Sequence, residues 1–199
     1  QYCPLLQHLI EVDNRYMFQT KENLMKTYIL AITLFFASST VWAENIDLGK
    51  SSLTWRGSKI VGDFHTGPIK IKKASIDDGK GEIIVDMNSI GETTLKGEMK
   101  GKFLGHIKSA DFFEVKKYPT AKLQIEKIDS GYLYGKLTVK GKTNDVTIPF
   151  TKKGKVYTGE LGFDRTKYGV VYGSGNFFKN LGDKIIADTI TVKFKIVTK

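Results

Sequence analysis

The sequence predicts an all-β domain, an antiparallel barrel or sandwich of about eight strands. Three observations indicate this class. Apolar and polar residues alternate along many short segments, which is the period of a strand with one buried face. Turn-forming pairs such as Asp78-Gly79 and Ser130-Gly131 separate these segments. Helical periodicity is almost absent from the same region, so a mainly helical or mixed fold is disfavoured.

Each alternating segment places its apolar residues on one face. In chain order, the residues that share such a face are Leu53 and Trp55; Ile69 and Ile71; Ile83, Val85 and Met87; Leu133, Leu137 and Val139; Val146, Ile148 and Phe150; and Ile186, Ile190, Val192, Phe194 and Ile196. Segments 92–108 and 176–181 do not alternate, and each is expected to hold a short helix.

The predicted interior can be filled or hollow. About eight antiparallel strands enclose a space that side chains fill or that holds one small ligand. Gly57 lies beside Trp55, and Gly135 lies between Leu133 and Leu137, on faces predicted to point inward. Small residues beside bulky ones leave room for a ligand, although a strand glycine also marks a bulge or bend. Both interpretations stay open at this point.

The first 43 residues are expected to lie outside the fold. From Met25 the chain reads "MKTYILAITLFFASSTVWA", with one early lysine, an apolar run and a small-residue box ending at Ala43. The apolar run is shorter than the roughly 20 residues that span a bilayer. We therefore predict an upstream extension at 1–24, a signal peptide at 25–43 cleaved after Ala43, and one domain at 44–199 in the periplasm.

Composition limits the partners and the chemistry. The single cysteine is Cys3, so the predicted domain has no disulfide and no thiolate, and no cysteine follows the cleavage box as a lipid anchor. The formal net charge is +10. Because the lysines occupy alternate strand positions, they are interpreted as the solvent-exposed face of the sheet rather than as a surface that binds nucleic acid. Contact with anionic membrane surfaces remains a further expectation.

Three polar residues interrupt the predicted apolar faces. In the period-two pattern, Lys59, His65 and Asp188 fall on the same face as their apolar neighbours. A charge buried on that face requires a partner. In a closed barrel the first and last strands are adjacent, so Lys59 could pair with Asp188. Arg165 is the competing partner, and the alternative is that these groups reach solvent at frayed strand ends.

The sequence gives little support for catalysis or for metal binding. His65 and His106 are the two histidines of the predicted domain. No HExxH, nucleophile elbow or P-loop occurs, and a zinc site would need carboxylates to complete it. We therefore predict a protein that is not an enzyme and that has no metal site and no cofactor.

Five stretches together resemble the YceI-like family. They are "WRGSKIVGDFHTG", "VDMNSI", "GHIKSADFFEVKKYPTAKL", "YGKLTVKGKT" and "FDRTKYGVVYGSGNFF", in order from about residue 51 to residue 195. The resemblance implies a lipocalin-like antiparallel β-barrel with one or two short helices that binds a long apolar molecule. It further implies an exported, often dimeric protein with no firmly assigned catalytic activity. The implied ligands are polyisoprenoids, isoprenoid quinones, fatty acids and fatty amides.

Individual residues match the family's motifs. The matching positions are Trp55, Lys59, His65 and Gly67 in the first motif; His106, Lys108, Ser109, Asp111, Phe112, Phe113, Tyr118 and Pro119 in the second; and Asp164, Arg165 and Tyr168 in the third. Glu114 stands where aspartate is usual and Ile107 where leucine is common, and both departures are conservative.

The adjacent rings of "GHIKSADFF" fit no regular period. Phe112 and Phe113 would point to opposite sides of a strand, so one of them would face water. We expect this segment to fold across one end of the barrel, with one ring plugging the barrel and the other lining its mouth. The side chains of His106 and Asp111 are expected to hold the turn by hydrogen bonds to the backbone.

The predicted function is non-catalytic carriage or sequestration of an amphipathic lipid inside the barrel. Lys59, His65 and Arg165 are expected to bind the polar head at the mouth. The candidate ligand-binding residues are Trp55, Lys59, His65, Phe112, Phe113, Tyr118, Arg165, Tyr168, Phe177 and Phe178. Two alternatives remain: a basic interaction or stress protein that has a filled barrel and binds anionic envelope components, and, less favoured, a lipid-modifying enzyme that uses His65 or His106.

Overall fold

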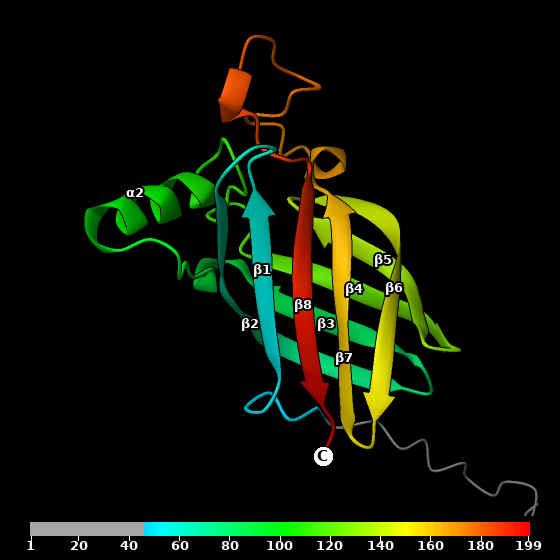
Figure 1. The fold of residues 1–199 in the computed structure, drawn as a ribbon. Coiled ribbons are helices and arrows are strands. Elements are labelled where there is room, and N and C mark those ends of the chain that lie inside the picture. Colours follow the sequence, from blue (N-terminus) through cyan, green and yellow to red (C-terminus); the bar gives the residue numbers. More distant parts are fainter. Residues whose placement is uncertain (1–45) are drawn as a thin grey trace, which may run out of the picture. The chain divides into compact units, whose positions relative to one another are not determined.

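The computed structural model describes residues 46–199, which form a closed barrel (Figure 1). Eight antiparallel strands follow one another around the barrel in chain order. The strands are β1 (Ser52–Ser58), β2 (Phe64–Asp77), β3 (Lys80–Asp86), β4 (Thr120–Asp129), β5 (Tyr132–Val139), β6 (Lys142–Lys153), β7 (Val156–Asp164) and β8 (Thr189–Val197). The predicted extension at 1–24 and signal peptide at 25–43 lie outside the described residues.

Pairing of the first strand with the last closes the barrel. Leu53 of β1 lies opposite Ile69 of β2 on one side and Phe194 of β8 on the other. A sandwich would leave β1 or β8 with an unpaired edge, whereas closure removes the edges. The predicted fold class, an all-β barrel of about eight strands with little helix, is confirmed.

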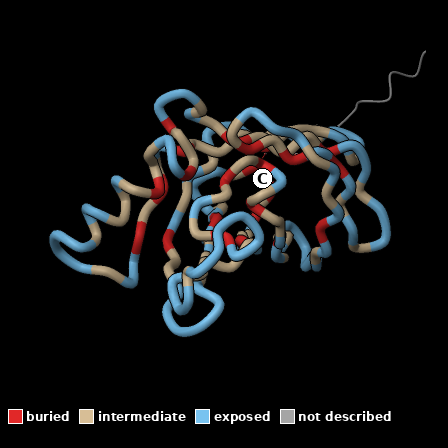
Figure 2. The backbone as a smooth tube through the Cα atoms, turned by 90° about the horizontal axis from the view of Figure 1, so that it is seen from above, coloured by how far each residue is buried: buried red, intermediate tan, exposed pale blue. Residues whose placement is uncertain are grey.

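The two faces of the wall differ as the alternation predicts. On β8, Ile190 and Ile196 are buried while Lys193 and Lys195 are exposed, and Lys193 Nζ lies 3.8 Å from Glu160 Oε2 on β7. Seen from above, buried and exposed stretches intermix around the wall (Figure 2). The alternate lysines therefore form a solvated outer face.

Two bulges shift this alternation within long strands. The pairing register shifts between Ile71 and Lys73 on β2 and between Ile125 and Lys127 on β4. Gly135 lies opposite Ile125, and a Cβ atom on Gly135 would lie 2.1 Å from the carbonyl oxygen of Gln124. This glycine therefore permits close backbone approach at a bulge and does not make room for a ligand.

The helical segments differ from the expectation. Helix α2 (Gly97–Lys108) occupies the second part of the predicted segment 92–108. The helix predicted at 176–181 is wrong: this stretch is a series of turns, followed by a three-residue 3₁₀ helix. Asn180 has a φ value of 62°, a left-handed conformation that the interior of a right-handed helix does not accommodate.

The remaining helical elements are short. They are the 3₁₀ helices η1 (Met87–Ser89), η2 (Arg165–Tyr168) and η3 (Gly182–Lys184). Helix α2 projects beside the barrel and buries Ile107 fully, while its Phe103 and Leu104 pack partly against the core (Figures 1 and 2). Within residues 46–199, no helix is long and apolar enough to cross a membrane.

Candidate ligand-binding cavity

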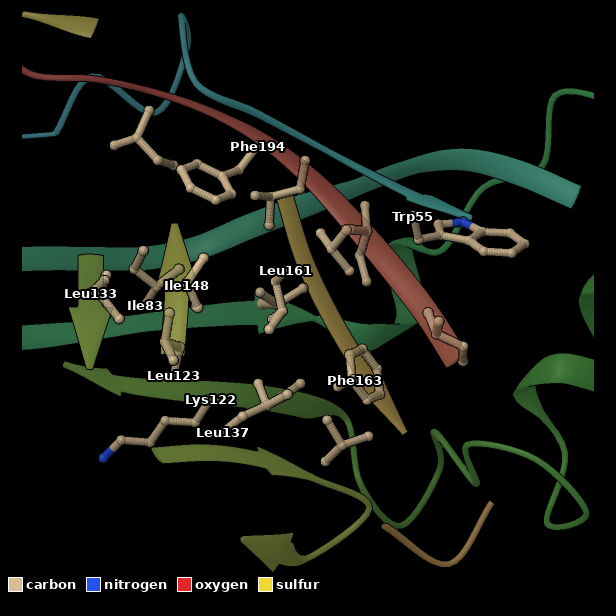
Figure 3. A pocket seen from close by; sticks show the side chains of 18 of the residues that line it. Trp55, Ile83, Lys122, Leu123, Leu133, Leu137, Ile148, Leu161, Phe163 and Phe194 are labelled. Carbon is tan, nitrogen blue, oxygen red and sulfur yellow. The ribbon is translucent and has the colours of Figure 1, made fainter. Parts of the chain in front are cut away.

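The barrel encloses an apolar cavity to which every strand contributes (Figure 3). The centre of a water-sized molecule can move through about 160 Å³ of it. The lining residues are Leu53, Trp55, Ile69, Ile76, Ile83, Val85, Met87, Ile90, Phe113, Ala121, Lys122, Leu123, Ile128, Leu133, Leu137, Val139, Ile148, Phe150, Tyr157, Leu161, Phe163, Ile190, Val192, Phe194 and Ile196.

The cavity wall is almost uncharged. Among these described lining residues only Lys122 carries a charge, and its Nζ lies 3.2 Å from Glu82 Oε2. In Figure 3 the Lys122 nitrogen lies at the far end of its side chain, away from the other labelled side chains. Its aliphatic stem therefore borders the cavity while its charge is neutralised by Glu82.

The cavity is elongated along the strands. On β8 its lining runs from Ile190 to Ile196, six residues apart, which is about 20 Å of extended chain. Leu53 and Ile196 lie toward one end, and Trp55, Phe163 and Ile190 lie toward the other. Such a shape suits a long, narrow apolar molecule better than a compact one.

The two adjacent phenylalanines have separate surroundings. The ring of Phe113 lines the cavity. The ring of Phe112 is buried beside it, with its centroid 5.2 Å from that of Phe113 and 5.6 Å from the Arg165 guanidinium carbon. Packing thus explains Phe112, while a ligand contact by Phe113 stays a prediction.

The turn that carries these two rings is held by Lys140, which lies in the connection between β5 and β6. Lys140 Nζ donates hydrogen bonds to the carbonyl oxygens of Ala110 (2.9 Å) and Phe112 (2.7 Å). The prediction that the side chains of His106 and Asp111 hold this turn is wrong. The His106 ring instead packs edge-on against Tyr172, at a centroid distance of 4.5 Å. Lys140 lies 28 residues beyond Phe112, so local sequence could not identify it.

Arg165 is a fully buried structural residue. Its side chain has no exposure to solvent, and burial lowers the pKa of its guanidinium while Asp188 and Asp164 oppose that change. All five of its N–H donors are used. The acceptors are the carbonyl oxygens of Ala187 (from Nε, 3.0 Å), Val170 (from Nη1, 2.7 Å), Tyr172 (from Nη1, 2.9 Å) and Ile186 (from Nη2, 3.0 Å), and Asp188 Oδ1 (from Nη2, 3.2 Å).

The expectation that Arg165 binds a lipid head is therefore wrong, and of the two partners that the sequence left open for Asp188, the structure selects Arg165. Arg165 cannot bind a lipid head, because it has no donor left and no open side. Asp188 pairs with Arg165 and not with Lys59, whose Nζ lies 3.9 Å from Asp63. Lys59 pairs through its backbone with Ile186, and its side chain extends into solvent.

The remaining candidates lie around the cavity and not on its wall. Tyr168 is buried with its ring edge-on to the cavity residue Phe163, and burial raises its pKa while a hydrogen bond with Asn144 opposes that effect. Tyr118 packs near Gly141. Phe177 and Phe178 are exposed. Of the ten predicted site residues, only Trp55 and Phe113 are among those that line the cavity.

A polar cluster adjoins the cavity at Trp55. Trp55 Nε1 donates to the carbonyl oxygen of Gly91 (2.8 Å), and the next residue, Glu92, is 1 % exposed. Glu92 Oε1 accepts hydrogen bonds from the backbone N–H and the hydroxyl of Thr94. Glu92 Oε2 has no hydrogen-bond partner among the described residues, and His65 Nδ1 lies 3.8 Å from it.

This cluster is closed by an aromatic side chain of α2. Phe103 lies between His65, at a centroid distance of 4.2 Å, and Trp55, at 6.2 Å. His65 Nδ1 also lies 3.0 Å from the hydroxyl of Thr94. Sequence reasoning identified Trp55 and His65 but missed Phe103 and Thr94, because these lie in the segment without a strand pattern.

The described residues hold no ready metal centre. Within residues 46–199, no three His, Cys, Asp or Glu side chains lie close enough to share a metal ion. The geometry on its own defines a class of protein: an eight-stranded antiparallel barrel around an elongated apolar cavity with a small polar cluster at one end.

The chain belongs to the YceI-like family. The model of the YceI-like domain matches residues 45–198, which confirms the resemblance noted from the sequence motifs. A search of curated proteins found no match.

Two solved structures share the fold, and a third superimposes less well. BcnA of Burkholderia cenocepacia superimposes with a TM-score of 0.57 and 23% sequence identity, covering 78% of this chain and 100% of that chain. A polyisoprenoid binding domain from Saccharophagus degradans, implicated in plant cell wall breakdown, gives a TM-score of 0.55 with 15% identity, covering 80% and 99%. The YceI protein of Campylobacter jejuni gives 0.48 with 16% identity, covering 66% and 84%.

Proposed function

We propose that this protein binds a long-chain amphipathic lipid inside its barrel and carries or sequesters it without chemical change. The observation that supports this proposal is the elongated cavity, lined almost wholly by apolar side chains from all eight strands. An alkyl chain gains about 0.8 kcal/mol for each CH₂ group that leaves water, so such a cavity binds it strongly. The similar domain from Saccharophagus degradans, described as polyisoprenoid binding, agrees with this class of ligand.

The proposed ligands are polyisoprenoids, isoprenoid quinones, fatty acids and fatty amides. The open volume of about 160 Å³ is close to the roughly 150 Å³ of an engineered apolar cavity that accepts benzene. A longer chain therefore requires lining side chains to change rotamer. Phe113, Phe150, Phe163 and Phe194 are the phenylalanines of the lining, and rotation of their rings would free space.

The polar head is proposed to lie at the Trp55 end of the cavity. His65 and Glu92 supply hydrogen-bonding groups there, and the exposed Lys59 lies on the connection that follows β1. Displacement of Phe103 would connect this cluster with the cavity, because its ring lies between Trp55 and His65.

Export to the periplasm, with cleavage after Ala43, is part of the same proposal. The measurement that checks it is N-terminal sequencing of the protein recovered from the cell envelope. A native terminus upstream of Met25 would contradict it.

The test of lipid binding uses two variants on one strand. Leu161 of β7 lines the cavity, and its neighbour Glu160 faces outward. We expect the wild-type protein and Glu160→Trp to carry a stoichiometric lipid in native mass spectrometry, and Leu161→Trp to carry much less because the indole fills the space. Organic extraction should recover the lipid with unchanged mass.

The control and the contradicting results are equally direct. Circular dichroism must show that both variants keep the barrel, since overpacking a core costs about 1–3 kcal/mol. Equal loading of Leu161→Trp and Glu160→Trp would place the lipid outside the barrel. A wild-type protein that is free of lipid and takes up no added chain would contradict the proposed function.

A further inference from the structure

Apolar side chains gather on two loops at one end of the barrel. The first loop (residues 59–63) joins β1 to β2, and the second (residues 169–188) lies between η2 and β8; together they are called the end loops. Ile60 is 65% exposed, Val61 70% and Phe177 58%, and the neighbouring Phe64, Tyr172 and Phe178 are also exposed. Soluble proteins rarely expose large apolar side chains in a group unless the surface binds something.

The end loops are hydrogen-bonded to each other. The backbone N–H of Ile60 donates to the carbonyl oxygen of Ile185 (3.0 Å), and that of Ala187 donates to Ser58 (2.8 Å). Figure 1 shows the second loop standing above the end of the barrel, next to the connection between β1 and β2. The two apolar groups therefore belong to one surface.

The second loop is built to hold its phenylalanines outward. The backbone N–H groups of Phe177 and Phe178 donate to the carbonyl oxygen of Ser174, whose hydroxyl donates to Asp188 Oδ2 (3.0 Å). Asp188 in turn pairs with the buried Arg165. Because this chain of contacts starts from a fully buried side chain, the exposure of Phe177 and Phe178 follows from an ordered loop.

The charges beside these apolar tips suit an anionic lipid surface. Lys59, Lys179 and Lys184 lie on the end loops, against Asp63, Asp183 and Asp188. Asp188 is neutralised by the buried Arg165, and the whole chain carries a formal net charge of +10. Apolar and aromatic tips flanked by lysines are typical of segments that insert into the headgroup region of a bilayer. The apolar groups project on loop tips, whereas an interface with a second copy needs a complementary face.

We propose that the end loops dock the protein onto anionic phospholipid bilayers by inserting Ile60, Val61, Phe177 and Phe178 into the headgroup region. The docking surface is independent of what the cavity holds, so its failure would leave the proposed lipid carriage untouched. Docking would also bring the Trp55 end of the cavity toward the bilayer, because the first loop begins one residue after β1.

The test is vesicle sedimentation with matched variants. The probe is a vesicle of phosphatidylglycerol and phosphatidylethanolamine, compared with one of phosphatidylcholine. We expect the double variant V61S/F177S to lose at least about tenfold in partitioning onto the anionic vesicles. The control M99S/Y132S removes two other exposed large side chains, one from α2 and one from β5, and it should partition like the wild type.

Three results would overturn the proposal. Wild-type partitioning by V61S/F177S would remove the end loops from membrane binding. Binding that disappears at about 1 M salt and is insensitive to V61S/F177S would indicate general attraction to a basic protein. A change from dimer to monomer in V61S/F177S without vesicles, measured by sedimentation velocity, would instead identify the surface as an interface between two copies.

A second measurement does not depend on loss of binding. In the variant Phe177→Trp the new indole reports its own surroundings. We expect its emission to shift to shorter wavelength on anionic vesicles, and brominated lipids to quench it. Emission that stays unchanged on bound protein would overturn the proposal, because the loop would then remain in water.

Discussion

Replacement of Arg165 by methionine tests whether this side chain organises the end of the barrel. Methionine keeps most of the apolar stem of arginine but lacks the guanidinium, and with it all five hydrogen-bond donors. Four of the acceptors are main-chain carbonyl oxygens of residues 170, 172, 186 and 187, and the fifth is the carboxylate of Asp188. The variant therefore removes the hydrogen bonds while it keeps the packing of the aliphatic stem.

The expected loss of stability is large. Breaking a buried ion pair from one side costs about 3–5 kcal/mol. Asp188 keeps the donors Ser174 and Asn176, and its side chain is 21% exposed, which places the expected loss near the lower end of this range. A loss of about 3 kcal/mol is a substantial part of the 5–15 kcal/mol that stabilises a typical domain.

Urea unfolding, followed by circular dichroism, measures this difference. The control is Lys136→Met, which removes a surface lysine whose Nζ lies 2.7 Å from Asp145 and should cost at most about 1 kcal/mol. Arg165→Lys keeps the positive charge but lacks the planar fork, and it should lie between the wild type and Arg165→Met. A free energy of unfolding for Arg165→Met within about 1 kcal/mol of the wild type would refute the reasoning.

Two further predictions concern a glycine and a tyrosine. Gly135→Ala should destabilise the barrel by about 1–3 kcal/mol in urea unfolding, because the new Cβ would lie 2.1 Å from the Gln124 carbonyl oxygen. The control is Gly57→Ala, where the nearest atom would lie 3.6 Å away, and its free energy of unfolding should stay within about 0.5 kcal/mol of the wild type. Burial raises the pKa of Tyr168, so its contribution to stability is complete below the unfolded pKa of about 10 and is lost as the pH rises through the folded value. Tyr168→Phe should therefore lose less stability in alkali than the wild type. It should also lack one alkaline step in an absorbance titration of the folded protein, and identical titrations would contradict the assignment.

The inward faces of most strands were predictable from sequence because they depend on a local period. Ile190, Val192, Phe194 and Ile196 were assigned to one face, and all four line the cavity. Closure of the barrel was not available from the period alone, since β1 and β8 lie more than 130 residues apart. It followed from the resemblance to the YceI-like family.

The alternation failed where the strands bulge. Ile76 and Ile128 line the cavity, but each lies beyond a register shift in its strand. An extra residue in one strand moves every later side chain to the opposite face, and nothing in "IKIKKASI" marks where the extra residue sits. A pattern with a constant period of two therefore could not place the far half of β2.

The residues singled out by the motifs mostly organise the end of the barrel and do not line it. Arg165, Tyr168 and Phe112 form a buried group behind Phe113, and of these four residues only Phe113 reaches the cavity. A cavity wall needs apolar side chains on the correct face, and many combinations of leucine, isoleucine and valine meet that need. A guanidinium whose five donors are all hydrogen-bonded, in contrast, can be supplied only by an arginine at that position.

The hydrogen bonds of Arg165 restrict which part of the molecule can move to open the barrel. Moving the second end loop away from the barrel would break the five hydrogen bonds of Arg165, whose acceptors lie in that loop and at its junction with β8. Helix α2 is attached less firmly, since Ile107 is its one fully buried residue and its N-terminus has no side-chain cap. Its Phe103 separates Trp55 at the cavity from His65. We therefore expect displacement of α2 to cost less free energy than displacement of the loop, and it is the movement that would join the polar cluster to the apolar interior.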